Sequence, residues 1–382
     1  MVPEHGPTWV GRTTVDEVAG LQVAPGYRHA RLLVTMGSDA LGEITVTLRR
    51  GIADAVARAE AIRLQIGPVP TPRTVPVSDE PLTVVVPTRG NPEGLGRTLR
   101  SVLACDHPAL TVLVVDQAPQ DDRTRLTVAD LADARVYYLR EAGRGVSAAR
   151  NRGLVAATTD LVAFTDDATE VDAEWASRIA GALADPDVAA ATGPVLSARL
   201  DTDDERAVDQ ARPRPRFRPR RITLGETALL PLARTLLGAG ANLAVRADVA
   251  RAAGGFDEAL ATGGEDADLV VRLVVAGHVV VHEPAAWVRR DHDPLERRDV
   301  AGGLAGVVTK LLLSTPGRVA LLRRVPGALR EVPLELSGTA LVSGPLRYLW
   351  SRGRVRRAGG RVPTVAVGAG SRTHNGVAST PP

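Results

Sequence analysis

Apolar and polar positions follow a new pattern from about residue 82 onward. Short apolar runs then alternate with segments in which apolar residues recur every three or four positions. The runs are LTVVVPT from Leu82, TVLVVD ending at Asp116, RVYYLRE ending at Glu141 and LVAFTDD ending at Asp167. Continuous apolar runs indicate strands buried on both faces, and the intervening segments indicate helices. The alternation predicts an α/β fold with a mostly parallel sheet flanked by helices.

The part of the chain before this region predicts a small separate unit. Two short strands are expected at 30–36 and 41–48 around a turn at Gly37–Asp39, followed by a helix from about 52 to 66. Residues before about 26 show little periodicity and are expected to form a loose leader. Residues 1–66 are therefore assigned to a small N-terminal α+β unit of two strands and a helix. The proline-rich stretch 67–81 is assigned to a linker, because proline interrupts both helices and sheet ladders.

The remaining boundaries follow from changes in composition. Residues 82–295 hold the α/β domain, within which the polar insertion 201–221 ends in RPRPRFRPRR and is expected to be extended. Residues 296–358 predict basic helices. The tail 359–382 is rich in glycine and small polar residues and is expected to be disordered.

Polar residues gather where the predicted strands end. Ligands of parallel sheets bind beyond the carboxyl ends of the strands, and these ends carry Thr88, Arg89, Asp116, Glu141, Asp166 and Asp167. Two adjacent carboxylates after a buried strand are costly unless a cation or polar ligand meets them. This favours a nucleotide or metal-phosphate site. The alternative is an acidic turn at the start of the next helix, where aspartate is common.

Composition narrows the remaining possibilities. The formal net charge is +3, and Lys310 is the only lysine among 47 basic residues, so we attribute the abundance of arginine to a compositional bias. The single Cys105 excludes an internal disulfide and a cysteine metal site. No signal-peptide pattern or uninterrupted apolar run of membrane-spanning length is present, so we expect a cytoplasmic protein. Nucleic-acid binding is not expected, because the basic stretches lack interleaved aromatic residues.

A glycine-rich motif raises a competing hypothesis. Gly143–Ala148 follows a predicted strand and precedes a predicted helix, and Asp166 follows about twenty residues later, as in dinucleotide-binding units. However, two strands come before this motif, and the one ending in Asp116 lacks a glycine-rich turn. A dinucleotide-dependent oxidoreductase is therefore ranked third among the hypotheses.

Seven segments in order carry a more specific signal: VVVPTRG, VLVVD, GRGVSAARNRGL, FTDDA, GAGAN, GGFDEAL and GGEDADL. Together they resemble the family 2 glycosyltransferases, which have the GT-A fold, and the resemblance covers about residues 82–292. It implies an inverting enzyme that transfers a sugar from a nucleotide-diphosphate donor to an acceptor hydroxyl. The acceptor class stays open among a glycan, a lipid-linked molecule and a small molecule.

The resemblance also implies roles for individual residues. Donor binding falls to Pro87, Thr88, Arg89, Asp116, Arg144, Arg150, Asn151, Asp166 and Asp167, and the acceptor or sugar side falls to Gly240 and Asn242. The acidic pair Glu265 and Asp266 is placed at the reaction centre, with Asp266 as the general base. The alternative role for Asp266 is the N-cap of the following helix. The alternative for the arginines is an ordinary surface position.

Two departures from the family pattern concern a metal. The carboxylate that commonly binds a divalent cation is replaced by Ala168, and Arg290 stands where a histidine is common, with His292 two residues later. One hypothesis is that Arg290 stabilises the leaving diphosphate instead of a metal. A second is that Asp167 and His292 still hold Mg²⁺ or Mn²⁺. A third is a non-catalytic relative that binds sugar nucleotides or glycans without transfer.

The basic C-terminal helices leave one more choice. Apolar residues such as 311–313 and 346–350 stand beside several arginines. The favoured interpretation is amphipathic helices packed on the α/β domain. The alternative is weak peripheral association with an anionic membrane, which would place the protein at the inner face of the membrane near a lipid-linked acceptor.

Overall fold

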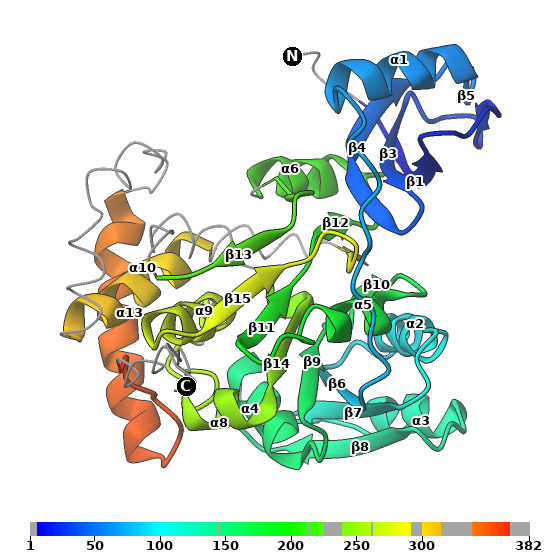
Figure 1. Ribbon diagram of the computed structural model, residues 1–382. Helices are drawn as coiled ribbons and strands as arrows, with labels where there is room; N and C mark the ends of the chain where they lie inside the picture. The colour runs from blue at the N-terminus through cyan, green and yellow to red at the C-terminus, as the bar shows by residue number, and fades with distance from the viewer. Residues whose placement is uncertain are drawn as a thin grey trace, which may run out of the picture.

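The computed structural model describes residues 6–143, 145–212, 214–224, 239–260, 263–291, 300–314 and 338–366. At its centre lies an eight-stranded sheet with the order β13-β15-β11-β14-β9-β6-β7-β8 (Figure 1). These strands are β6 (Leu82–Thr88), β7 (Leu110–Gln117), β8 (Val136–Glu141), β9 (Leu161–Phe164), β11 (Val188–Thr192), β13 (Arg220–Ile222), β14 (Leu243–Arg246) and β15 (Val279–His282). The pairings make six strands run in one direction, with β13 and β14 opposed. The expected α/β class with a mostly parallel sheet is confirmed.

Helices cover both faces of this sheet, which is why its strands are apolar at successive positions. They are α2 (Pro92–Leu103), α3 (Arg123–Asp130), α4 (Val146–Ala156), α5 (Trp175–Gly181), α8 (Ala247–Ala252) and α9 (Glu265–Val275). In β6, Val84 and Val86 pack on the side of α2 and α5, whereas Val85 packs on the side of α4 and α9. Gly153 of α4 lies so close to β6 that an added Cβ would come 2.3 Å from a methyl group of Val85.

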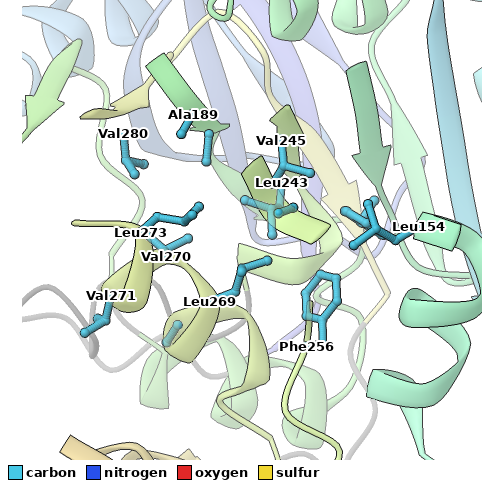
Figure 2. Packing of buried hydrophobic residues seen from close by; sticks show 14 of the residues in the cluster. Leu154, Ala189, Leu243, Val245, Phe256, Leu269, Val270, Val271, Leu273 and Val280 are labelled. Carbon is cyan, nitrogen blue, oxygen red and sulfur yellow. The ribbon is translucent and has the colours of Figure 1, made fainter. Parts of the chain in front are cut away.

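Helix α9 is buried along its whole length. Figure 2 shows Leu269, Val270 and Leu273 of this helix facing the same apolar cluster as Leu243 of β14 and Phe256. Burying several large aliphatic side chains stabilises the fold by about 1.5–3 kcal/mol for each one. The first turn of α9 is therefore fixed at the carboxyl edge of the sheet.

The N-terminal unit contains more structure than the sequence pattern predicted. Its main sheet has the order β1-β3-β4, with β1 (Thr8–Thr14) parallel to β3 (His29–Met36) and antiparallel β4 (Asp39–Thr47) on the other side. The expectation of a loose leader before residue 26 is wrong, because β1 and the short strand β2 (Leu21–Gln22) lie there. Strand β2 pairs with β5 (Ile52–Ala53). Helix α1 (Ala55–Gln65) follows, capped by the Asp54 side chain.

The N-terminal unit is attached to the α/β domain by polar and apolar contacts. Its strands lie at one end of the molecule, drawn in blue in Figure 1. The buried side chains of Leu33 and Trp287 belong to one apolar cluster that joins the two parts. Arg73, in the proline-rich segment, donates to Asp39 at 2.7 and 2.8 Å and to the buried Glu283 at 3.0 Å. This segment therefore connects the two parts through a charged contact as well as through the chain.

A second, smaller sheet has the order β10-β16-β12. It consists of β10 (Thr169–Val171), β12 (Val195–Ser197) and β16 (Val288–Arg290). The prolines of the insertion after β12 led us to expect an extended segment, but part of it is helical. Residues Asp203–Ala211 form helix α6, whose capping box joins Thr202 and Glu205 and satisfies the first backbone amides.

The C-terminal helices pack on the α/β domain. They are α10 (Val300–Leu313) and α13 (Gly338–Arg357), and Val307, Leu311 and Tyr348 enter the same cluster as α9. The buried Lys310 amine donates to Asp257 at 2.7 Å and to Asp268 of α9 at 2.9 Å. Burial lowers the pKa of Lys310, and the carboxylates of Asp268 and Asp257 oppose this effect.

The described part of the tail differs from the expected disorder. Residue Val365 is buried, and the Arg361 carbonyl accepts a hydrogen bond from the Glu258 amide at 2.9 Å. The tail therefore packs on the domain as far as residue 366, and residues 367–382 lie outside the described ranges. Within the described chain, none of the helices has the length and apolar character needed to cross a membrane.

We expect Arg73→Ala to lower the free energy of unfolding by about 2–3 kcal/mol, because it leaves the buried Glu283 carboxylate without its guanidinium partner. Urea denaturation of the full chain measures the loss. Arg63→Ala is the matched control, since Arg63 forms a 3.9 Å pair with the exposed Glu60 and should change stability little. Equal effects of the two substitutions would contradict the proposed attachment.

Candidate active site

The carboxyl edge of the central sheet brings Thr88 of β6 next to Asp167, which follows β9. The Thr88 hydroxyl donates to Asp167 Oδ2 at 2.6 Å, and the Arg89 backbone amide approaches the same oxygen at 3.4 Å. Burial raises the pKa of Asp167, while the hydrogen bond from Thr88 opposes the rise. The side chain of Arg89 is exposed at this edge and Pro87 is buried in β6. This part of the predicted site is therefore assembled by adjacent parallel strands.

Asp116 lies near the carboxyl end of the neighbouring strand β7, in register with Thr88. It is buried, and its carboxylate accepts a hydrogen bond from the Tyr138 hydroxyl of β8 at 2.9 Å. Burial and this hydrogen bond raise the pKa of Tyr138 to about 12. Tyr138 holds Asp116 at the sheet edge, a role that its place in an apolar run did not reveal.

Arg150 lies at the centre of the site. It is buried on α4, and its guanidinium contacts Glu265 of α9 at 2.5 Å and Asp166 at 3.1 Å. The guanidinium carbon lies 5.5 Å from the centroid of the Phe256 ring. A Cβ added to Gly240 would come 2.4 Å from this guanidinium, so the backbone approach of the 3₁₀ turn η1 (Ala239–Ala241) depends on glycine.

Glu265 and Asp266 occupy the first turn of α9. The N-cap is Gly264, in a left-handed conformation, so the alternative assignment of Asp266 as N-cap is wrong. Asp266 accepts hydrogen bonds from the Gly240 and Ala267 amides, both at 2.7 Å. Burial raises the pKa of Asp266, against the effect of Arg150.

Glu265 has a different environment from its neighbour. Burial raises its pKa to about 7, although Arg150 favours the ionised form. Its Oε1 contacts Arg150, and Oε2 has no hydrogen-bond partner within the described structure. The pair therefore combines one carboxylate held by backbone amides with one that titrates near neutrality.

The two positions that depart from the family pattern are neighbours in space. Strand β16 pairs with β10 so that Arg290 lies opposite Thr169, and the Asp291 amide donates to the Ala168 carbonyl at 2.9 Å. The Arg290 guanidinium is 3.1 Å from Asp166 Oδ2. Burial alone would raise the pKa of Asp166, but Arg290 and Arg150 hold it below its ordinary value. Asp166 is therefore an ionised carboxylate between two arginines.

Comparison with known proteins agrees with this geometry. The sequence model described as "Glycosyl transferase family 2" matches residues 83–237. The matched segment includes Arg150, Asp166 and Asp167 of the site. The pre-mycofactocin glycosyltransferase of Mycobacterium tuberculosis is 32% identical over 335 residues, which cover 84% of this chain. This chain spans 64% of that relative's length, slightly less than two thirds.

Other similar proteins include the succinoglycan biosynthesis protein ExoM of Rhizobium meliloti, 29% identical over 224 residues, or 56% of this chain and 67% of that protein. Among solved structures, residues 1–349 of S. aureus TarS in complex with UDP are 16% identical, with a TM-score of 0.47 over 73% of this chain and 92% of that chain. The mannosyltransferase PcManGT of Pyrobaculum calidifontis, in complex with GDP-Man and Mn²⁺, is 18% identical, with a TM-score of 0.43 over 76% of this chain and 79% of that chain.

Two residues assigned to ligand contacts instead join parts of the α/β domain. The Asn151 amide exchanges hydrogen bonds with the Phe256 backbone at 2.8 and 3.0 Å and donates to Glu258 at 2.9 Å. Asn242 is completely buried, where it accepts from the Trp175 indole at 2.9 Å and donates to the Pro194 and Ala286 carbonyls. Their amide groups are committed to the protein. Arg144 and His292 lie outside the described residues.

The described carboxylates at this edge are engaged by other groups of the protein. Magnesium is usually bound by one or two carboxylates together with waters and substrate phosphates. Here Asp166 faces two guanidinium groups, Asp167 is held by Thr88, and Ala168 offers only a methyl group. Across the described ranges there is no group of three or more His, Cys, Asp and Glu residues suited to a metal ion.

One further arginine acts on the site from the insertion. The positive charge of Arg212, at the end of α6, contributes to lowering the pKa of Asp166. From the sequence, the arginines of this insertion are expected to lie in a solvated loop, with attraction of an anionic acceptor as the alternative. Only the fold, which brings α6 back toward the carboxyl edge, distinguishes Arg212 from its neighbours.

We expect the stability difference between wild type and Glu265→Gln to depend on pH. The ordinary pKa of 4.5 rises to about 7 in the folded protein, so the uncharged form contributes stability that is complete below pH 4.5 and lost as the pH rises through 7. Wild type should therefore lose on the order of 2 kcal/mol relative to the variant between pH 5 and pH 8. Denaturation at a series of pH values tests this.

The control for that experiment is Glu60→Gln, whose side chain is 61% exposed. Its stability difference from wild type should stay nearly constant over the same range. A constant difference for Glu265→Gln, or one that changes in the opposite direction, would mean that Glu265 has an ordinary pKa in the folded chain.

Proposed function

We propose that this protein is an inverting glycosyltransferase that moves a sugar from a nucleotide-diphosphate donor to an acceptor hydroxyl. The single observation that carries this proposal is the convergence on Arg150 of Asp166, from the end of β9, and Glu265, from the start of α9. This convergence joins the donor edge of the sheet to an acidic pair suited to proton transfer. The match to the family 2 model and the similarity to named glycosyltransferases support the same reaction.

The donor lies along the carboxyl edge in this proposal. Thr88, Arg89 and Asp116 face the base and ribose, and Asp166 and Asp167 border the diphosphate. Asp116 is fixed by Tyr138 and Asp167 by Thr88, so both carboxylates are ordered before the donor binds. Ordered polar groups reduce the entropy lost on binding.

Asp266 is the general base of the proposed reaction. Two backbone amides fix its carboxylate, and burial raises its pKa toward the range in which it accepts a proton effectively. Glu265 keeps Arg150 in place beside it. The acceptor hydroxyl attacks the anomeric carbon from the side opposite the leaving diphosphate, which inverts the configuration at that carbon.

A specific observation favours the second candidate, a non-catalytic relative that binds sugar nucleotides or glycans. Asp266 is only 2% exposed, and both of its oxygens accept backbone hydrogen bonds. A general base must reach the acceptor hydroxyl. Detection of sugar transfer with purified protein separates the two candidates, because a binding protein gives none.

The acceptor is proposed to be a glycan, a lipid-linked molecule or a small molecule. Helix α13 exposes Leu346, Leu349 and Trp350, and Arg354 lies over the Trp350 ring at 4.6 Å. Basic and apolar side chains on one helix suit weak peripheral contact with an anionic membrane. This surface supports the inner face of the membrane as a place of action for the proposed cytoplasmic enzyme.

We expect Asp266→Asn to lower kcat by about 10²–10⁴-fold while donor affinity changes little, because the substitution removes the proton acceptor and keeps the side-chain size. Thermal unfolding checks that the variant folds, since its NH₂ group replaces an oxygen that accepts a backbone hydrogen bond. A panel of nucleotide sugars in a thermal-shift assay identifies the donor, and a transfer assay with that donor measures kcat. The control Asp248→Asn alters an exposed aspartate of α8 and should retain normal turnover. Near-normal turnover of the Asp266 variant would show that another group accepts the proton.

A further inference from the structure

Two arginines from different segments contact one carboxylate. Arg150 of α4 and Arg290 of β16 each lie 3.1 Å from a different oxygen of Asp166. Arg150 also pairs with Glu265 of α9. Two guanidinium groups therefore converge on Asp166 at the point where the sheet edge meets the acidic pair.

The arginines differ in their access to solvent. The Arg150 side chain is 4% exposed and lies behind the site, in contact with Glu265. The Arg290 and Asp166 side chains are 18% and 16% exposed. Arg290 therefore stands at the open side of the ion-pair network, where an anion from solution can reach it, while Arg150 is enclosed.

The backbone that carries Arg290 is held by both neighbouring strands and by its adjacent residues. Strand β16 pairs with both β10 and β12. The preceding residue, Arg289, donates to the Gly11 carbonyl of the N-terminal unit at 2.6 Å. The Arg289 guanidinium also lies 5.6 Å from the centroid of the Trp287 ring. The following Asp291 contacts Arg97 at 2.9 Å and Arg199 at 2.7 Å. The position of Arg290 is therefore set before any ligand binds, as preorganised electrostatic stabilisation requires.

We propose that Arg290 binds the diphosphate of the donor directly and replaces a divalent cation. This inference rests on the proposed function. Asp166 holds the arginines in place in the free protein, and the more highly charged diphosphate competes with it for their donors. A guanidinium forms two parallel hydrogen bonds to phosphate oxygens, and its charge does not depend on pH in the physiological range.

The proposed transfer step moves one electron pair to the leaving group and one proton to the general base. The acceptor oxygen forms a bond to the anomeric carbon as the bond from that carbon to the diphosphate oxygen breaks. The electron pair of the broken bond stays on the diphosphate, which gains one negative charge opposite Arg290, and the acceptor proton passes to Asp266. The arginine thus stabilises the charge that develops on the leaving group, a task that a bound cation performs in other transferases of this kind.

The test measures the affinity of the full-length protein for UDP, GDP, ADP and CDP by titration calorimetry, with and without excess EDTA and with added Mn²⁺. The diphosphate that binds best is then compared with its monophosphate. We expect the affinity for the diphosphate to change less than threefold under EDTA. A loss of tenfold or more that Mn²⁺ restores would overturn the inference and leave glycosyl transfer intact as the proposed function.

Variants locate the effect in Arg290. Arg290→Gln should weaken the diphosphate about 10- to 100-fold and the monophosphate much less, because the contact is made to the terminal phosphate. Arg290→Lys should lie between wild type and the glutamine variant, since it keeps the charge and loses the paired hydrogen bonds. Thermal unfolding of each variant confirms that it is folded.

One matched control is Arg214→Gln, which alters an arginine of the insertion whose side chain is 69% exposed. The other is Arg221→Gln on the edge strand β13, which removes a 2.8 Å ion pair with Asp185. Both should bind like wild type. If Arg290→Gln discriminates between diphosphate and monophosphate as wild type does, Arg290 does not contact the terminal phosphate and the inference fails. If no nucleotide binds to wild type under any condition, the proposed function itself fails.

Discussion

The arrangement of this site depends on one buried guanidinium. Arg150 lies in the protein interior, where an unpaired charge would be prohibitively costly, so carboxylates must approach it. Those carboxylates are Asp166, from the turn after β9, and Glu265, from the first turn of α9. The electrostatic requirement of one side chain thus fixes the distance between the sheet edge and the helix that carries the acidic pair.

Several weaker constraints protect that arrangement. Gly240 gives the guanidinium space, and Phe256 covers it with an aromatic face. Asn151, one residue along α4, holds the Phe256 backbone by hydrogen bonds in both directions. Asn151, which the sequence suggests as a ligand contact, therefore acts within the protein by holding Phe256 against Arg150.

The sequence was sufficient for β6, β7, β8 and β9, whose apolar runs are continuous, but it did not reveal the antiparallel strands β13 and β14. It was insufficient for β10 and β16, since strands of three residues have no detectable alternation, and these two bring Arg290 to Asp166. Helix α6 escaped notice because the prolines that follow it dominate the composition, although Thr202 and Glu205 form a recognisable capping box. The role of Arg212 depends on the packing of that helix, and no local pattern separates it from the neighbouring arginines.

The packing of Lys310 has a consequence for chemical labelling. Since it is the only lysine in the sequence, its amine is the only side-chain amine available to acylating reagents or cross-linkers. In the folded protein that amine is enclosed between Asp257 and Asp268, and Asp257 also accepts a hydrogen bond from the Tyr348 hydroxyl. Reaction at this position therefore requires α10 to separate from α9, and the rate of modification reports how often the C-terminal helices leave the helix that carries Glu265 and Asp266.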